Sequence, residues 1–122
     1  MNDLRKCAAE AIGTFYLCFA GIAAICSTGP GIDSGIGLVG IALAHGLALS
    51  VAVCTFGGLS GAHFNPAVTC GFLVTGRIKL PLAMKYIGAQ LVGAIIAAAI
   101  CKLVFPVTAV KAVNLGIPLP SN

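Results

Sequence analysis

Long apolar stretches separated by short polar segments dominate this chain. Residues 7–28 carry a single charged side chain, Glu10, and a turn-rich segment over residues 29–35 ends this first stretch. Residues 34–76 then contain no Lys, Arg, Asp or Glu. This uncharged stretch has roughly twice the length that one membrane-spanning helix needs. The pattern predicts more than one element within this second stretch. A third apolar run, over residues 81–105, predicts another spanning helix.

The end of the second stretch does not have the pattern of a continuous helix. It begins with four small residues that favour a loop, namely Gly57, Gly58, Ser60 and Gly61. Asn65 is a favoured helix N-cap, and Pro66 suits the first helical position because its missing N–H would be unpaired there. A helix from Asn65 to Gly76 would cross only about half of a hydrocarbon core. Such a segment is stable at membrane depth only when it is buried in protein or lines a watery cavity, and this points to a pore.

We therefore expect an all-α membrane protein with a single domain over residues 1–122. Its three transmembrane helices lie near residues 8–28, 36–56 and 81–105, and a re-entrant loop with a half-helix occupies about residues 57–76. After Val107 we expect only a short tail, with Pro118 and Pro120 and no further span.

The composition supports a membrane protein and argues against several other classes. Of the 122 residues, 59% are hydrophobic and 8% are charged, which is not typical of a soluble domain. The net charge of +4 comes from basic residues near segment ends, so we expect contacts with lipid and no nucleic-acid partner. No metal or cofactor is expected either. The six cysteines form no CxxC pair and lie in or beside apolar segments, where they would pack as small residues: Cys7, Cys18, Cys26, Cys54, Cys70 and Cys101.

Small residues recur at every fourth position along the second and third predicted spans, a spacing that lets membrane helices approach closely. On the second span they are Ala42, Gly46, Ser50, Cys54 and Gly58. On the third they are Ala89, Gly93, Ala97 and Cys101. We expect both stripes to face other helices.

The basic residues also predict the orientation. One side of the predicted membrane fold carries five of them, Arg5, Lys6, Arg77, Lys79 and Lys85. The other side carries two, Lys102 and Lys111. Because basic residues concentrate in cytoplasmic segments, we expect a cytoplasmic N-terminus in the cell (plasma or inner) membrane. The re-entrant segment would then enter from the cytoplasmic side as a loop, turn near the midplane and return as a helix.

The segment SGAHFNPAVT resembles the first signature loop of the aquaporin and aquaglyceroporin (major intrinsic protein) family. The similarity extends to AAEAIGTF, AHG and YIGAQLVGAIIAA and covers roughly residues 8–105. It implies a fold of two inverted repeats whose half-helices meet at the midplane, assembled as a tetramer. The chain resembles the first repeat, and the second signature loop has no counterpart in it. A second, inverted repeat would therefore have to come from another chain or a missing half.

The same resemblance suggests roles for the loop. Asn65, followed by Pro66 and Ala67, would cap the half-helix and keep its amide free to donate to a passing oxygen. The helix N-terminus would bring about half a positive charge to the midplane, a barrier to protons and cations. The family's carbonyl ladder would correspond to Gly61, Ala62 and His63. The alternative is an ordinary buried turn with a helix cap.

His45 lies 20 residues before Asn65. In the family this helix position helps to form the selectivity filter on the extracellular side. Many water channels have Phe there, glycerol facilitators have Trp, and plant vacuolar-type channels have His. Leu49, one turn further on, would line the same wall. Because His is smaller than Trp and can hydrogen-bond, His45 favours water, with ammonia or urea, over glycerol.

Glu10 is an acid within a spanning segment, where charged groups are costly and normally paired or functional. The resemblance suggests that Glu10 accepts N–H groups of the signature loop and that Gln90 joins this network. We interpret both residues as structural support rather than as a proton relay.

The sequence therefore predicts a passive channel, not an enzyme, for water and small neutral solutes. Two alternatives stay open. A half of a small transporter would place its substrate at a charged residue, for which Glu10 is the candidate. A truncated or split membrane protein would not conduct by itself.

Overall fold

The computed structural model describes residues 2–32 and 34–117, and these residues form helices and no strands. In chain order, the elements are α1 (Asp3–Cys26), α2 (Gly37–Ser60), α3 (Pro66–Val74), α4 (Leu80–Val104), α5 (Val107–Ala112) and a 3-10 turn, η1 (Asn114–Gly116). The helices α1, α2 and α4 have 24, 24 and 25 residues and are long and apolar enough to cross a membrane. The structure thus confirms the expected fold class.

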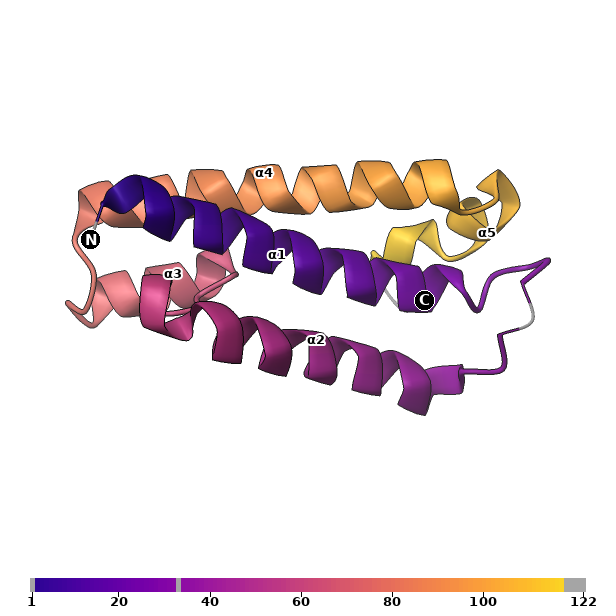
Figure 1. The fold of residues 1–122 in the computed structure, drawn as a ribbon. Helices are drawn as coiled ribbons and strands as arrows, with labels where there is room; N and C mark the ends of the chain where they lie inside the picture. The colour runs from indigo at the N-terminus through magenta and orange to yellow at the C-terminus, as the bar shows by residue number, and fades with distance from the viewer. Residues whose placement is uncertain (1, 33, 118–122) are drawn as a thin grey trace.

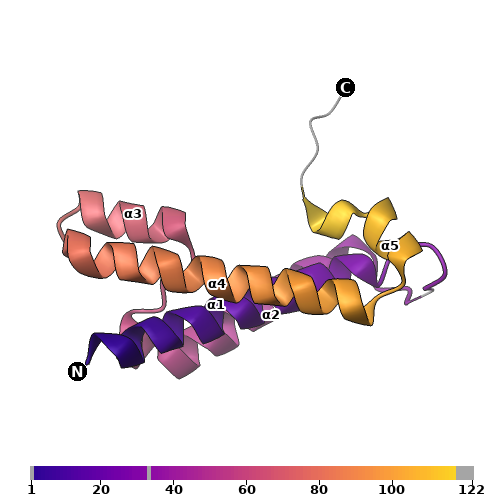
Figure 2. The ribbon, with the colours of Figure 1, turned by 90° about the horizontal axis from the view of Figure 1, so that it is seen from above.

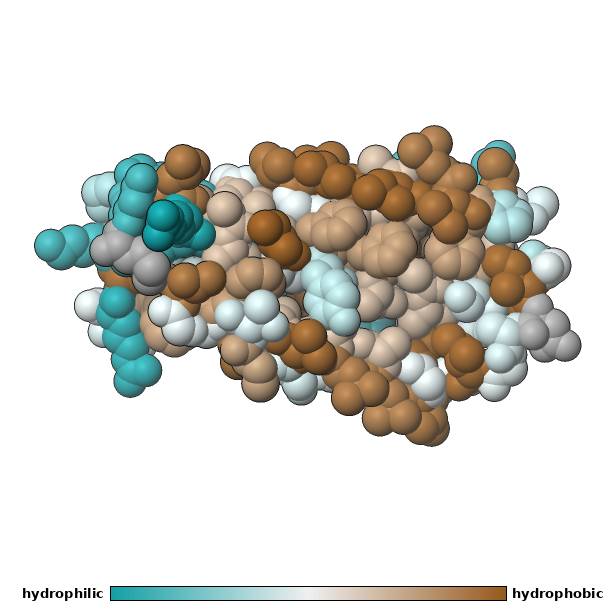
Figure 3. All heavy atoms as spheres, viewed as in Figure 1, coloured by the Kyte–Doolittle hydropathy of each residue, from teal (hydrophilic) through white to brown (hydrophobic). Residues whose placement is uncertain are grey.

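The long helix α1 lies between α2 and α4 and packs against both (Figure 1). The first turns of α1 and α4 lie at the same end, where Lys85 Nζ and Asp3 Oδ2 form an ion pair at 2.8 Å. The short helix α3 begins near the middle of the bundle, returns to this end and lies beside the first half of α4 (Figure 2). Hydrophobic residues cover the middle of the visible face, and hydrophilic ones gather at the end with the N-terminus (Figure 3). This is the surface expected of a protein that crosses a membrane.

The small-residue stripe of α4 packs as the sequence predicted. Gly93, Ala97 and Cys101 are buried, and Ala89 is half-buried. A Cβ atom added to Gly93 would overlap the carbonyl oxygen of Ala11 in α1. Glycine at this position therefore allows the backbones of α1 and α4 to touch.

On α2, the predicted stripe is not the face that packs against α1. The predicted stripe is exposed along its whole length, at Ala42, Gly46, Ser50, Cys54 and Gly58. The face toward α1 instead buries Ala48 and Ala52 and half-buries Ala44. These residues also recur at every fourth position. Because α2 carries small residues at this spacing on two faces, the spacing alone could not identify the one that meets α1.

The predicted loop also begins later than expected. Helix α2 continues through Gly57, Gly58 and Ser60. It ends at Gly61, whose backbone is left-handed (φ 92°) and whose N–H donates to Gly57 O at 3.0 Å. A continuous helix satisfies its own backbone in apolar surroundings, and this outweighs the cost of about 1 kcal/mol for each helical glycine.

The half-helix is correspondingly short. Helix α3 has 9 residues and ends at Val74, two residues before the predicted end, so it spans roughly 14 Å. The turn that follows contains Gly76 with a positive φ of 72°. Arg77 N donates to Phe72 O at 2.8 Å and closes the helix end.

The tail folds back onto the end of α1. Ala109 of α5 is buried, and a Cβ on Gly29 would lie 2.6 Å from its side chain. Gly116 of η1 likewise lies against Ile25. Pro118 and Pro120, together with Asp33 of the first turn, lie outside the described residues. All six cysteines are free thiols, and two of them, Cys26 and Cys101, are buried.

Candidate functional site

The segment between α2 and α3 has an unusual backbone. Gly61, Ala62 and Phe64 have φ angles of 92°, 54° and 49°, and Asn65 then returns to an extended conformation (φ −152°, ψ 129°). Non-glycine residues rarely adopt positive φ, least of all bulky ones. A conformation of this kind persists only where surrounding contacts fix it.

Glu10 of α1 supplies the main contacts. Its Oε1 accepts hydrogen bonds from Ser60 Oγ at 2.5 Å and from His63 N at 3.0 Å. Its Oε2 accepts from Phe64 N at 2.7 Å and from Gln90 Nε2 of α4 at 2.8 Å. The side chain is 0% exposed. All four partners are donors, so a carboxylate, which only accepts, satisfies every one of them.

Thr69 of α3 forms a second centre of the network. Its hydroxyl lies 3.0 Å from Gln90 Nε2 and 3.1 Å from His63 Nδ1. It also lies 3.2 Å from Asn65 O, to which it donates. The Nε2 atom of Gln90, on α4, therefore connects Glu10 of α1 to Thr69 of α3.

The aromatic side chains of the loop are held as firmly as its backbone. The ring of Phe64 is buried and meets Phe56 edge-on at a centroid distance of 6.2 Å. A Cβ on Gly13 of α1 would overlap the Phe64 ring. The His63 ring lies 4.3 Å from the Phe72 ring and 5.3 Å from the Tyr86 ring.

Sequence reasoning missed three members of this network. Ser60 accepts from Ala62 N at 3.1 Å as well as donating to Glu10, and Tyr86 OH donates to Ser60 O at 2.7 Å. Thr69 is the third. Helical spacing could have found two of them, because Thr69 follows the Asn65 cap by four residues and Tyr86 precedes Gln90 by four.

These contacts treat the N–H and carbonyl groups of the loop differently, and we call this difference the polarity of the loop. Its N–H groups are occupied on the protein side, those of His63 and Phe64 by Glu10 and that of Ala62 by Ser60. Across residues 2–32 and 34–117, by contrast, no group donates to the carbonyl oxygens of Gly61, Ala62 or His63. The loop can therefore offer a row of acceptors to a molecule beside it.

Asn65 closes the loop and starts α3. Its Oδ1 accepts from Ala67 N at 2.8 Å, with Pro66 at the first helical position. Since an N–H needs an acceptor, this bond assigns the amide orientation and directs Nδ2 away from the helix. Nδ2 donates to no described residue, and Asn65 and Ala67 are both exposed.

His45 and Leu49 lie on α2 and have no hydrogen bond to the loop among the described residues. Leu49 is 42% exposed, and His45 is half-buried. His45 Nδ1 lies 2.8 Å from Ile41 O. Because a carbonyl only accepts, Nδ1 is a ring nitrogen that carries a proton.

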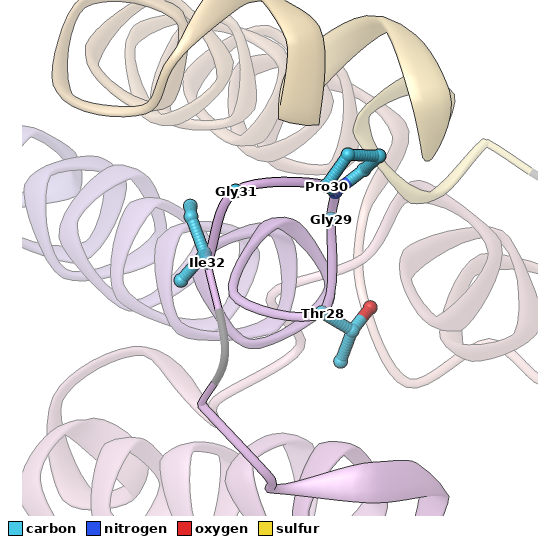
Figure 4. Close-up of a pocket in the computed structure, with 5 residues that line it drawn as sticks. All are labelled: Thr28, Gly29, Pro30, Gly31 and Ile32. Carbon is cyan, nitrogen blue, oxygen red and sulfur yellow. The ribbon is translucent and has the colours of Figure 1, made fainter.

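A separate hollow lies at the far end of α1 and is lined by Thr28, Gly29, Pro30, Gly31 and Ile32. Figure 4 shows these residues on a single turn, with the Pro30 ring toward α5. None of them has a titratable side chain. Within the described part of the chain, no group of three His, Cys, Asp or Glu residues could hold a metal ion. The loop before α3 is therefore the candidate site.

Comparisons with known proteins identify relatives of this chain. The chain is 46% identical to Aquaporin Z of Bradyrhizobium diazoefficiens over 96 residues, 79% of this chain and 40% of the relative. It is 43% identical to Aquaporin NIP1-2 of Arabidopsis thaliana over 102 residues, 84% and 34% of the two chains. It is 43% identical to Glycerol uptake facilitator protein-like 6 of Lactiplantibacillus plantarum over 113 residues, 93% and 50%. The chain thus spans half or less of these relatives' length. The family model described as Major intrinsic protein matches residues 1–119, and this integral membrane protein therefore belongs to the major intrinsic protein family.

Proposed function

We propose that this chain forms one half of a passive transmembrane channel for water and small neutral solutes. The observation that carries the proposal is the polarity of the loop. Glu10 and Ser60 occupy the N–H groups of residues 62–64 from one side, so the neighbouring carbonyl oxygens are left to a permeating molecule. Water, which donates two hydrogen bonds, suits a row of fixed acceptors.

The loop is also suited to excluding ions. The N-terminus of α3 lies behind Asn65 and brings about half a positive charge to this point. The exposed residues of the site, Gly61, Asn65 and Ala67, carry no charge that could compensate it. Cations and protons would meet an electrostatic barrier here, whereas neutral solutes would not.

The names of the relatives support a channel for water or small solutes, and their length supports a second half. A partner would supply the inverted repeat, either as another chain or as the missing part of a longer one, and family resemblance favours a tetramer. We place the N-terminus in the cytoplasm and the protein in the cell membrane, because the basic residues favour that orientation.

The contacts of Glu10 argue against the transporter alternative. A substrate-binding carboxylate needs at least one free lone pair for the substrate, whereas each oxygen of Glu10 already accepts two hydrogen bonds. Glu10 and Gln90 are therefore supports of the loop. Asn65, Pro66 and Ala67, the carbonyl groups of Gly61, Ala62 and His63, and the side chains of His45 and Leu49 would line the passage.

Replacing Asn65 with alanine tests the proposal most directly. The loss of the cap should cost about 1 kcal/mol of stability, and the loss of the free amide should strongly reduce water permeation. Vesicle swelling measured by stopped-flow light scattering on the conducting assembly reports the second effect.

Asn2→Ala is the matched control, because Asn2 caps α1 through the same kind of bond, Leu4 N to Oδ1 at 3.1 Å. The two variants should lose similar stability, and only Asn65→Ala should lose permeation. If an assembly with Asn65→Ala conducts water normally, Asn65 does not contribute to the pore.

Solute preference is a separate prediction. A passage lined by His45 and Leu49 should conduct water much faster than glycerol, because a ring of this size narrows the passage. His45→Ala should raise glycerol flux relative to water flux, as measured by light scattering in osmotic gradients of glycerol and of an impermeant sugar. Glycerol passing through the unmodified assembly as readily as water would contradict the assignment.

A further inference from the structure

The His45 side chain reaches from α2 to α1 and ends at a glycine. A Cβ added to Gly21 of α1 would overlap Nε2 at the tip of the ring. It would also lie 2.8 Å from Cδ2 and 3.0 Å from Cε1. Gly21 itself is buried. The missing side chain of Gly21 therefore creates a recess, and the ring tip of His45 fills it.

The ring is held at its other end as well. The Nδ1–H group donates to Ile41 O at 2.8 Å, one turn back on the same helix. With one edge bonded to its own helix and the tip in the recess, the ring has little freedom to rotate. Its position across the α1–α2 contact is set by these two contacts together.

Other glycines show that this recess is specific. Gly46, the neighbour of His45 on α2, has no atom within 4 Å of an added Cβ. Gly13 of α1 receives the Phe64 ring, and Gly93 of α4 meets backbone atoms of Ala11. Gly21 is thus the glycine whose missing side chain is matched to His45.

We propose that Gly21 is a positioning residue that sets how far His45 reaches into the solute passage. The inference rests on the proposed function, in which His45 lines that passage. Any side chain at position 21 would push the ring away from α1, toward the side of α2 on which Leu49 is exposed. Since a rigid ring cannot shorten, the displacement narrows the opening and discriminates more strongly against larger solutes.

The test compares Gly21→Ala with Gly46→Ala in the conducting assembly, by water and glycerol flux in vesicles. Gly21→Ala should reduce water flux several-fold and glycerol flux further, whereas Gly46→Ala should leave both unchanged. His45→Ala, combined with Gly21→Ala, should restore water flux to that of His45→Ala alone, because the smaller side chain no longer needs the recess. A merely structural role for Gly21 would not depend on His45 in this way.

Each outcome of this comparison either supports or overturns the positioning role of Gly21. If Gly21→Ala fails to fold, recovery of folding in the double variant supports the steric pairing, and continued misfolding overturns it. If Gly21→Ala leaves the flux ratio unchanged while His45→Ala alters it, Gly21 does not position the filter, although the proposed function stands. If His45→Ala itself has no effect on either flux, the assignment of His45 to the passage fails first.

Discussion

Replacement of Glu10 by alanine should unfold the loop before α3 and destabilise the whole bundle. The Ser60 hydroxyl can rotate to another acceptor, but the N–H groups of His63 and Phe64 and the Gln90 amide are fixed in place by the helices. Each buried donor without a partner costs about 1–3 kcal/mol. We therefore expect a loss of about 3 kcal/mol or more in the free energy of unfolding.

A glutamine at position 10 should separate the hydrogen bonds from the shape of the side chain. Glu10→Gln preserves the volume but turns one acceptor oxygen into a donor that faces other donors, so it should lose much of the same stability. Asp3→Asn is the matched control on the same helix. The ion pair of Asp3 with Lys85 is exposed, with side-chain exposures of 46% and 55%, and such pairs contribute little to stability because water screens them.

Chemical unfolding in detergent micelles, followed by far-UV circular dichroism, would measure the three variants. Hydrogen exchange at the amides of His63 and Phe64 would report the loop itself, and should accelerate in both Glu10 variants and stay slow in Asp3→Asn. Glu10 variants with unchanged stability and slow exchange would mean that the strained backbone is held by other contacts.

The second large effect concerns conduction. By itself the chain should insert into vesicles in one orientation and should not conduct water. Without a second repeat, the carbonyl oxygens of the loop would face lipid, at a cost of several kcal/mol each. The face of α2 opposite α1 is likewise exposed over its length. Water permeability should appear when a polypeptide carrying a second repeat is co-expressed.

A second copy of this chain, inserted upside down, is the competing source of the missing half. Five basic residues on one side against two on the other oppose it, because dual insertion needs nearly balanced loops. Single cysteines at positions 2 and 111, in a chain without its own six, can be labelled with a membrane-impermeant thiol reagent from each side. Equal labelling from both sides, together with water flux from the purified chain, would favour the inverted homodimer.

Much of the helical architecture follows from local chemistry. Apolar runs of sufficient length can satisfy their backbone in a membrane only as helices, which determined α1, α2 and α4. The pair Asn65-Pro66 determined where α3 begins, because a cap and a residue without an N–H suit that position and few others. An acid in a membrane segment needs a partner, and the family resemblance suggested that Glu10, together with Gln90, supports the loop.

Tertiary contacts decided what local preferences left open. The glycines at 57 and 58 favour a loop by themselves, yet the helix continues to Ser60, because its backbone has no better partner in apolar surroundings. Two faces of α2 carry small residues at the same spacing, and only the docking of α1 buries Ala48 and Ala52 and leaves the other face free. The recess at Gly21 for His45 and the strained φ of Phe64 depend on residues far apart in the chain. No local pattern specifies such contacts, since each exists only once α1, α2 and the loop have packed together.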